Sequence, residues 1–481
     1  MSITRRNVVL TSTFVFLLVL IALASRNLGF VTTYSAALHL TSPAEAEPAA
    51  PPSEPSSAKP TPSHEVSHEL STTTSRPAES QEYFHQAFSS KKSTALDFPT
   101  IKHVCDRIPW EEKEKDRVYL QCGEMFAGLT SIMSQLKVCF KYALDSGSHL
   151  VLPSMPLRDS TNLKEFNTEN QKAYHEYGEW FDAEHLIESL GQACPKMKIV
   201  RIKQLNKDVR VKYDWKVDIG KAPGYRMFTS YYWPGRRFQP FLEDELAKLR
   251  EEAEKVPAPE HTDGITVVHI HAMFLVYRIT DDPTGHDLKL WNEIGSLMRF
   301  KEDTRTIVNE LLSLIDRPYY GVHFRAENDT IWSSPEDQLA VDLDALDQAW
   351  VKYGSPDAER PLVYLACGDK GQVKTFVEAG AARGWKVTHK WDVASKSPNK
   401  EDLLKRMDAL AFDFLGSLDM GVMMMGSFFF GITGSAFSST VANARDGTGR
   451  YRGSSFYLED DGGARSHLMN DGEADGYPCC L

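Results

Sequence analysis

Residues 117–152 form the stretch that decides the fold, and they read RVYLQCGEMFAGLTSIMSQLKVCFKYALDSGSHLVL. Residues 117–122 predict a short strand, and residues 123–128 a loop that contains glycine. Residues 129–145 carry apolar side chains at helical spacing, and residues 149–152 predict the next strand. Strand, loop, helix and strand make one βαβ unit, which implies a parallel sheet covered by helices.

A second series of alternating elements follows in the C-terminal part of the chain. The predicted strands are 319–324, 362–366, 386–389 and 427–433, and the predicted helices are 342–353, 372–383, 403–418 and 438–445. Two such series suggest two doubly wound α/β domains, in which ligands bind beyond the carboxyl ends of the strands. We therefore look for chemistry in the loops after Phe324, Ala366 and Thr433.

Length and composition are those of a globular protein. The chain has 481 residues, of which 25% are charged and 42% apolar, so a wholly disordered, collagen-like or disulfide-dense chain is excluded. The length suggests about three domains, or two large ones with extra segments. The net charge of −12 argues against nucleic acid as the main partner, although a local basic cluster can still bind an anion.

The cysteines give two constraints. The chain has seven cysteines, which is an odd number, so at least one thiol stays unpaired or pairs between chains. The sequence has no C-x-x-C pair, which argues against a zinc ribbon or a thioredoxin-type site.

The N-terminus carries an apolar run at residues 8–24 (VVLTSTFVFLLVLIALA), flanked by Arg5, Arg6 and Arg26. Its seventeen residues are just long enough to span a bilayer, and the preceding arginines favour a cytoplasmic N-terminus. The alternative is a signal peptide, because residues 22–24 (ALA) suit signal peptidase. The first interpretation predicts a single-pass type II protein of the Golgi or endoplasmic reticulum membrane, and the second predicts a secreted protein.

A stem is predicted over residues 25–100. Residues 41–64 contain seven prolines and seven serines or threonines, so this segment cannot bury enough apolar surface to fold. We expect a disordered spacer of the kind that carries O-glycans. A short tail at 1–7, an anchor, a stem and a globular body are typical of Golgi-resident enzymes, and equally of any stalked surface protein.

The loop after the strand at 319–324 carries the sharpest constellation. Residues 321–330 read GVHFRAENDT and place Arg325 where the strand ends. A guanidinium is a planar fork of donors that matches phosphate oxygens. The alternative is that Arg325 pairs with Glu327 or Asp329 and only clamps the loop.

The second constellation is residues 431–439 (GITGSAFSS), which follow an apolar strand and open a helix. Backbone N–H groups at a helix N-terminus favour a phosphate, together with the helix dipole. The alternative is an ordinary serine N-cap that satisfies those N–H groups internally.

These residues resemble the GDP-fucose protein O-fucosyltransferase family, including its plant- and fungal-type relatives. The plant-type motif His-Leu-Arg-x-Glu-x-Asp corresponds to residues 323–329 (HFRAEND). Further matching stretches are 430–431 (FG), 435–438 (SAFS), Arg445, 363–369 (VYLACGD) and 128–130 (GLT). The resemblance covers roughly residues 117–445. The chain departs from it at Thr130 and Ser131, where relatives often carry asparagine and glutamine.

The resemblance implies a GT-B fold, in which two Rossmann-like domains face a cleft. It implies an acceptor-side domain at 101–310, a nucleotide-sugar domain at 311–460 and a tail at 461–481. It further implies inverting transfer of fucose from GDP-fucose to a protein or glycan hydroxyl, with no cofactor and no obligatory metal. There are two alternatives. The protein is a transferase for another nucleotide sugar, or it is a catalytically inactive relative that binds glycans or acts as a scaffold.

The same resemblance suggests roles for individual residues. Arg325 would hold the β-phosphate and the glycosidic oxygen as GDP leaves. The residues expected to bind the GDP-sugar are His323, Asp369, Ser435, Phe437, Ser438, Gly128 and Thr130. Glu124 is the candidate general base for the acceptor, because some relatives carry a glutamate in this loop; the alternative is a solvated loop carboxylate.

Two further patterns favour structural roles. Residues 342–344 (DLD) match the D-x-D pattern of metal-dependent transferases, but they open a predicted helix, which favours capping. His269 and His271 lie on one strand face, and two ligands are too few for a closed zinc site.

Overall fold

The structure is a computed structural model that describes residues 83–89, 97–158, 163, 174–221, 238–258, 261–271, 284–327, 334–355, 357–432, 435–447, 454–458 and 466–468. All of these lie in one compact unit, Arg76–Leu481. The predicted anchor at 8–24 lies outside the described residues. Within the described part, no helix is long and apolar enough to cross a membrane.

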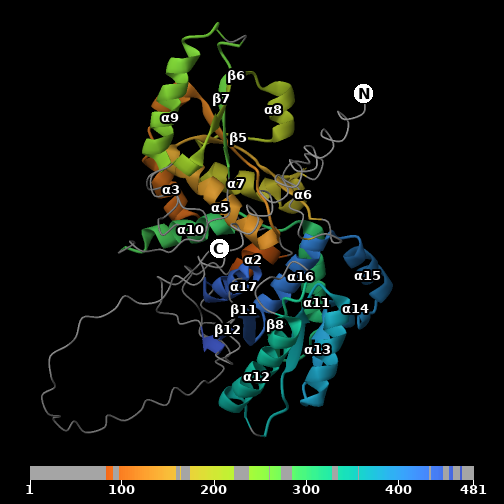
Figure 1. Ribbon diagram of the computed structural model, residues 1–481. Helices are drawn as coiled ribbons and strands as arrows, with labels where there is room; N and C mark the ends of the chain where they lie inside the picture. Colours follow the sequence, from red (N-terminus) through yellow and green to blue (C-terminus); the bar gives the residue numbers. More distant parts are fainter. Residues whose placement is uncertain are drawn as a thin grey trace, which may run out of the picture. The chain divides into compact units, whose positions relative to one another are not determined.

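The first sheet contains the βαβ unit that the sequence predicts. Its strands are β1 (Val118–Gly123), β2 (His149–Val151), β5 (Ile199–Val200), β6 (Val211–Val217) and β7 (Ile265–His271). They lie in the order β5-β2-β1-β7-β6, and every pairing is parallel (Figure 1). Helix α5 (Leu129–Ser146) connects β1 to β2 and ends at Gly147, whose φ of 63° suits glycine.

The second sheet is built from the predicted second series. Its strands are β8 (Tyr319–His323), β9 (Leu362–Ala366), β10 (Val387–His389), β11 (Phe428–Ile432), β12 (Ser455–Leu458) and β13 (Ser466–Leu468). They lie in the order β10-β9-β8-β11-β12-β13, and only the β12–β13 pairing among them is antiparallel. The chain proceeds from β8 towards β10 on one side and then crosses to β11 on the other. The strand order therefore reverses at β8, and the predicted α/β class with parallel sheets is confirmed.

Helices and a small hairpin complete the described part (Figure 1). The helices are α2 (Tyr83–Phe88), α3 (Pro99–Asp106), α4 (Trp110–Asp116), α6 (Tyr177–Trp180), α7 (Ala183–Ala193), α8 (Ile202–Asp208), α9 (Phe238–Ala253), α10 (His286–Ser296), α11 (Glu302–Ser313), α12 (Pro335–Tyr353), α13 (Lys370–Ala382), α14 (Lys390–Ser395), α15 (Lys400–Asp408), α16 (Phe412–Met424) and α17 (Ala436–Gly447). The hairpin pairs β3 (Ser154–Pro156) with β4 (Tyr174–Glu176). Helix α5 follows the first strand of the first sheet, whereas α16 and α17 pack on the second sheet. Because α5 packs against both α16 and α17, the helices of the two sheets are in contact there.

Three predictions from the sequence are wrong: the single helix over 403–418, the end of the stem and the capping role of residues 342–344. The single helix predicted over 403–418 is two helices, α15 and α16, separated at residues 409–411. No glycine or proline marks this break, which arises because α15 packs on α11 and α14 while α16 packs on α5, α11 and the second sheet. The predicted stem extends too far, because α2 lies within it and its Phe88 ring stacks on Phe300 with centroids 4.6 Å apart.

The capping role predicted for residues 342–344 is also wrong. Helix α12 begins two turns earlier, where the Ser334 hydroxyl accepts a hydrogen bond from the Asp337 N–H (3.1 Å). Asp342 is therefore mid-helix and only 1% exposed, and burial raises the pKa of its carboxyl well above the ordinary value. Asp344 instead forms an ion pair with Arg383.

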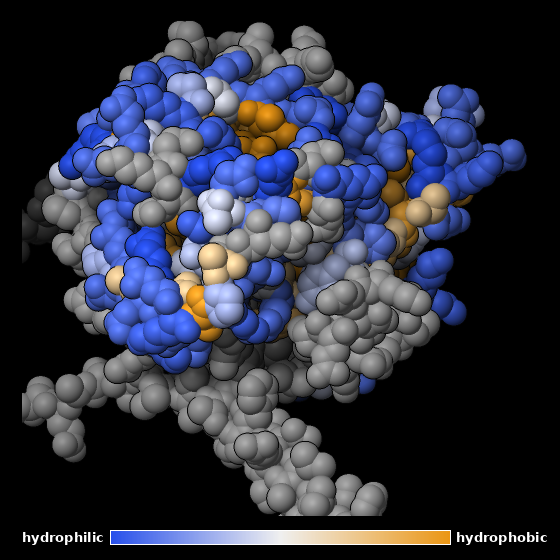
Figure 2. Space-filling model, turned by 90° about the horizontal axis from the view of Figure 1, so that it is seen from above, coloured by the Kyte–Doolittle hydropathy of each residue, from blue (hydrophilic) through white to orange (hydrophobic). Residues whose placement is uncertain are grey.

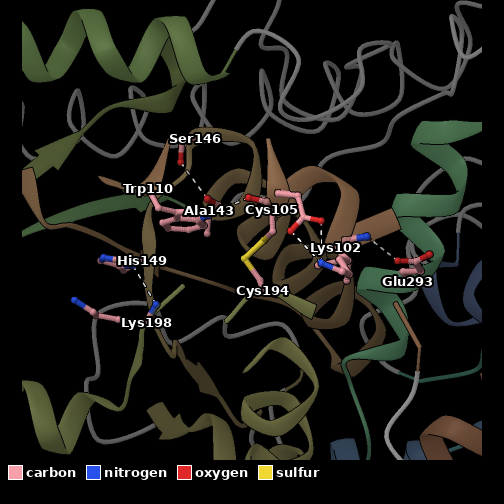
Figure 3. Close-up of a disulfide and its surroundings, with 11 residues drawn as sticks. Lys102, Cys105, Trp110, Ala143, Ser146, His149, Cys194, Lys198 and Glu293 are labelled. Atoms are coloured by element: carbon pink, nitrogen blue, oxygen red, sulfur yellow. Dashed lines mark hydrogen bonds and ion pairs between the residues drawn. A yellow bond between two sulfur atoms is a disulfide. The ribbon is translucent and has the colours of Figure 1, made fainter. Parts of the chain in front are cut away.

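Two disulfides join described cysteines: Cys105 with Cys194 and Cys122 with Cys139. The first ties α3 to the end of α7 beside Trp110, whose ring N–H donates to the Cys105 carbonyl at 3.0 Å (Figure 3). Cys367 is buried and unpaired. The pairing thus leaves one free thiol among the five described cysteines.

Removing the Cys105–Cys194 disulfide with paired serines should lower the free energy of unfolding by about 4 kcal/mol. The bond closes a span of 89 residues, and a loop of that length gains much entropy in the unfolded chain when it is released. Urea unfolding of both proteins measures the change. Removing Cys122–Cys139, which closes only 17 residues, should cost less. Equal losses would contradict the loop-entropy argument.

The face of the molecule seen in Figure 2 is mostly hydrophilic among the described residues. Figure 2 shows one face on which hydrophobic residues appear in separate areas between hydrophilic ones. Val256 and Val351 are the large hydrophobic side chains that stand exposed among the described residues. A broad apolar docking face is therefore not evident in the described part of the chain.

Candidate functional site

The candidate site is built where β8 ends. Arg325 follows β8 by two residues, and its guanidinium forms an ion pair with Glu327, as the loop-clamp alternative predicts. The Arg325 side chain is 16% exposed and that of Glu327 is 11% exposed. The arginine is thus held by a carboxylate at the strand exit and still reaches the surface.

Glu327 connects two neighbouring strand ends. Its Oε1 accepts a hydrogen bond from the Gly368 N–H at 2.8 Å, just beyond β9. Burial alone would raise the pKa of Glu327, but the charge and the hydrogen bond of Arg325, together with smaller contributions from His323 and a backbone hydrogen bond, outweigh it, and the net pKa is lowered. Glu327 therefore stays ionised and keeps Arg325 charged and oriented.

His323 is the last residue of β8, and it is buried at 6% exposure. Its Nδ1 lies 2.8 Å from Oγ of Ser438, and this Oγ also accepts the Ile432 N–H at 3.0 Å. Burial lowers the pKa of His323 to about 3, so the imidazole is neutral. The Ser438 hydroxyl can donate to Nδ1 while it accepts from Ile432, in which case the His323 ring proton lies on Nε2.

The neutral His323 should make the protein sensitive to acid. An unfolded histidine has a pKa of about 6.5 and takes up a proton below it, whereas folded His323 does not until about pH 3. Proton uptake by the unfolded chain lowers the free energy of unfolding as the pH falls through this window. Between about pH 7 and about pH 5 the His323→Gln variant should lose roughly 2 kcal/mol less stability than the wild type in urea unfolding. Parallel losses in the two proteins would show that His323 does not carry this effect.

The turn before α17 also behaves as predicted for an N-cap. Ser435 is buried, and its Oγ accepts the Ser438 N–H at 3.4 Å. The half-buried Phe437 ring lies 4.5 Å from the His323 ring, centroid to centroid. These three residues and His323 are therefore neighbours, whereas Thr433 and Gly434 lie outside the described residues. Their expected contacts with a nucleotide remain a prediction.

Gly431 explains how α17 comes so close to β11. A Cβ at Gly431 would lie 2.7 Å from Cβ and 2.8 Å from Oγ of Ser438. Any larger side chain would push Ser438 away from His323.

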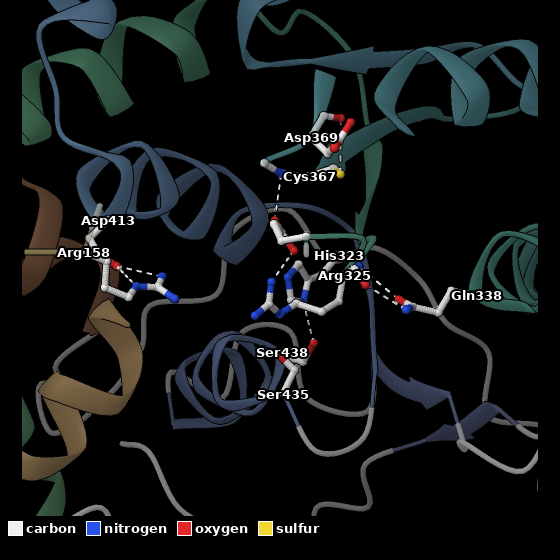
Figure 4. Close-up of polar contacts among 11 residues, drawn as sticks. Arg158, His323, Arg325, Gln338, Cys367, Asp369, Asp413, Ser435 and Ser438 are labelled. Carbon is white, nitrogen blue, oxygen red and sulfur yellow. Dashed lines mark hydrogen bonds and ion pairs between the residues drawn. The ribbon is translucent and has the colours of Figure 1, made fainter. Parts of the chain in front are cut away.

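Asp369 caps the next helix. Its exposed carboxylate accepts the Gln372 N–H at 2.9 Å and so forms the N-cap of α13. It follows β9, the neighbour of β8, so the topology brings it to the same sheet edge as Arg325 (Figure 4). Its expected contact with the GDP-sugar is not tested by these hydrogen bonds and stays a prediction.

Gly128 and Thr130 lie at the N-terminus of α5. Gly128 precedes the helix and has no side-chain cap, and Thr130 is buried in the first turn. The helix is capped from outside instead, because the Leu129 N–H donates to Asp413 at 3.2 Å. A Cβ at Gly128 would lie 2.6 Å from Nη2 of Arg158, so any larger residue here would displace this guanidinium.

The partly buried Arg158 forms an ion pair with the buried Asp413. Nε and Nη2 of Arg158 lie 3.0 and 2.8 Å from Asp413 Oδ1, and the Arg158 N–H lies 3.1 Å from Oδ2. Arg158 follows β3, whereas Asp413 lies in the first turn of α16, so the pair fastens elements that are distant in sequence (Figure 4).

Glu124 lies in the loop after β1, near the carboxyl end of the first sheet. Its φ is 54°, which is uncommon for a residue other than glycine. The side chain is 49% exposed, and its two oxygens lie 2.9 Å from Lys216 Nζ and 2.8 Å from His271 Nδ1. It is therefore an exposed loop carboxylate that also contacts Lys216 and His271, and its role as a base stays a prediction. His271 belongs to this cluster, while its strand neighbour His269 pairs with Asp214.

The solved structures that this chain resembles include those of POFUT1 and of the fucosyltransferase NodZ. The crystal structure of POFUT1 in complex with GDP matches with a TM-score of 0.40 and 13% identity, over 72% of this chain and 99% of that chain. The crystal structure of the fucosyltransferase NodZ from Bradyrhizobium matches with a TM-score of 0.35 and 12% identity, over 74% and 99%. No protein-family model and no curated protein matches the sequence. At these values the similarity does not extend to activity.

Four residues that shape the site were missed in the sequence analysis: Arg158, Asp413, Gln338 and Gln135. Gln338 forms hydrogen bonds with the backbone of Arg325, and Gln135 with the backbone of Phe126. Arg158 and Asp413 are 255 positions apart, so no local pattern links them. A local signal existed for the glutamines, because each is a polar residue on the apolar side of a helix that follows a strand. Such residues are costly to bury and usually have a hydrogen-bonding task.

Proposed function

We propose that the protein is a glycosyltransferase that moves fucose from GDP-fucose to a hydroxyl of a protein or glycan, with inversion and without an obligatory metal. The observation that carries the proposal is the position of Arg325. It leaves the strand at which the sheet order reverses, where ligands of such sheets bind, and it follows by two residues His323, which contacts Phe437 and Ser438 in the first turn of α17.

Breaking the sugar–phosphate bond places negative charge on the departing diphosphate. A preorganised guanidinium and the N–H groups at a helix N-terminus stabilise that charge in the transition state. A guanidinium has five donors, more than one carboxylate can accept, so Arg325 can hold Glu327 and phosphate oxygens together. The acceptor hydroxyl then attacks the anomeric carbon from the opposite face, with Glu124 as the proposed base.

The wider arrangement is also part of the proposal. Residues 101–310 and 311–460 would be the acceptor and donor domains of a GT-B enzyme, with the site in the cleft between them. We place this body in the lumen of the Golgi or endoplasmic reticulum, anchored by residues 8–24, or outside the cell if that segment is cleaved. Two disulfides support an oxidising compartment.

One observation favours the inactive alternative. Arg325, Asp369 and Ser435 already have partners within the chain, as they would in a protein that binds no nucleotide.

Donor binding separates these possibilities. We expect GDP-fucose and GDP to raise the melting temperature, because a ligand at about 100 times its Kd stabilises by about 2.7 kcal/mol. Release of GDP from GDP-fucose should persist in EDTA. GDP-mannose and UDP-sugars serve as competing donors. A shift only with a UDP-sugar would overturn the assignment of donor, and no shift and no GDP release with any donor would favour the inactive relative.

A further inference from the structure

Two buried glutamines make the same pair of hydrogen bonds to the backbone of a loop residue. Gln338 Nε2 donates to the Arg325 carbonyl at 2.7 Å, and the Arg325 N–H donates to Gln338 Oε1 at 3.1 Å. Gln135 Nε2 donates to the Phe126 carbonyl at 2.8 Å, and the Phe126 N–H donates to Gln135 Oε1 at 3.2 Å. Each side-chain amide thus pairs with one residue as a neighbouring strand would.

We call these two glutamine–backbone pairs, Gln338 with Arg325 and Gln135 with Phe126, the glutamine clamps. They occupy corresponding places in the two sheets. Phe126 lies in the loop after β1, which is flanked by β2 and β7, and Arg325 lies in the loop after β8, which is flanked by β9 and β11. In both cases the strand order reverses at that strand, and the glutamine comes from the next helix, α5 or α12.

Both amides are removed from water. Gln135 is fully buried and Gln338 is 4% exposed. Burying an amide is unfavourable unless its hydrogen bonds are made, so these glutamines are not explained by packing alone. In Figure 4, Gln338 reaches the Arg325 backbone from α12, and the guanidinium extends away from it towards His323 and Ser438.

We propose that Gln338 and Gln135 are positioning residues for the transfer, Gln338 on the donor side and Gln135 on the acceptor side. This inference rests on the proposed function. Gln338 fixes the backbone from which Arg325 reaches the diphosphate, and Gln135 fixes the loop that carries Glu124 and leads to Gly128. Misplacing a reacting or stabilising group by about 1 Å costs roughly 100-fold in rate.

The donor-side test replaces Gln338 with methionine, which keeps the length and volume but removes both hydrogen bonds. We expect kcat for GDP release from GDP-fucose to fall by about 10- to 100-fold, with KM changing by less than about threefold. Amide exchange of the peptide over residues 321–327 should become faster, because the Arg325 N–H loses its acceptor. Gln338→Glu keeps an acceptor for that N–H and should lose less activity, which also covers the case in which the methionine variant does not fold.

The acceptor-side test replaces Gln135 with methionine. Transfer to the acceptor should fall by about 10- to 100-fold, while GDP release by hydrolysis stays within about threefold of wild type. Gln239→Met is the matched control, because Gln239 is exposed on α9 and should change neither rate.

The outcomes separate this inference from the proposed function. A wild-type protein that turns over no nucleotide sugar contradicts the proposed function itself. The positioning roles are overturned if the wild type is active and the Gln338→Met and Gln135→Met variants keep both GDP release and transfer to the acceptor within threefold of it. Unchanged amide exchange over residues 321–327 in folded Gln338→Met would likewise overturn the clamp on Arg325.

Discussion

Replacing Arg325 with alanine should reduce turnover of GDP-fucose by about 100- to 1,000-fold. The reason is the loss of a preorganised cation where the diphosphate gains charge as its bond to fucose breaks. Because that charge is greatest in the transition state, kcat should fall more than the affinity for GDP. Steady-state GDP release and a separate GDP titration measure the two quantities.

Controls for this variant follow from its surroundings. Alanine leaves Glu327 as a poorly exposed carboxylate without its cation, which costs stability. The double variant Arg325→Ala, Glu327→Gln removes that charge, and glutamine retains an oxygen for the Gly368 N–H. Arg325→Lys keeps the charge but loses the planar fork, so it should still be impaired. If folded Arg325→Ala turns over GDP-fucose within a few-fold of wild type, Arg325 has no catalytic part.

Replacing Arg445 with methionine should lower the free energy of unfolding by about 5 kcal/mol or more. This arginine is fully buried at the C-terminal side of α17. Its guanidinium donates to the carbonyls of Met423, Met424, Gly426, Ser427 and Ser454 and to the Ser454 hydroxyl. These acceptors lie at the end of α16, before β11 and before β12, and most would lose their donor inside the protein.

Urea unfolding measures this loss. The matched control is Arg317→Met, because Arg317 is an exposed arginine whose ion pair with Glu359 should contribute less than about 1 kcal/mol. A loss below about 2 kcal/mol for Arg445→Met would show that water or neighbouring groups replace the guanidinium. The expected result assigns Arg445 a structural role, although the sequence places it among the motifs that resemble fucosyltransferases.

Much of the candidate site was accessible from the sequence because strand ends are local features. The apolar run before Arg325 and the serine-rich turn before α17 predict where the strands end, and parallel strands share one carboxyl edge. The structure brings His323 next to Phe437 and Ser438, and their binding of a nucleotide stays a prediction that rests on the family resemblance. The sequence left open whether Arg325 pairs with Glu327, because spacing alone does not determine which way an arginine turns.

Helix bounds predicted from local sequence signals are wrong where tertiary packing determines the bounds. Residues 403–415 contain neither glycine nor proline, yet α15 and α16 pack on different partners and separate at residues 409–411. Asp342 resembles a capping residue in sequence, but α12 starts earlier at a better cap, Ser334. In both cases the decisive contacts come from elements far along the chain.

The sequence by itself determined the α/β class, the parallel pairing implied by the first βαβ unit, and the strand exits that hold Arg325 and Ser438. These follow from hydrophobic periodicity and turn residues, which act over a few positions. Only the tertiary structure decided the Arg158–Asp413 pair, the glutamine clamps, the setting of Arg445 and the cluster around Glu124. Their physical basis is the burial of polar groups, whose partners are chosen by the folded chain and not by neighbours in sequence.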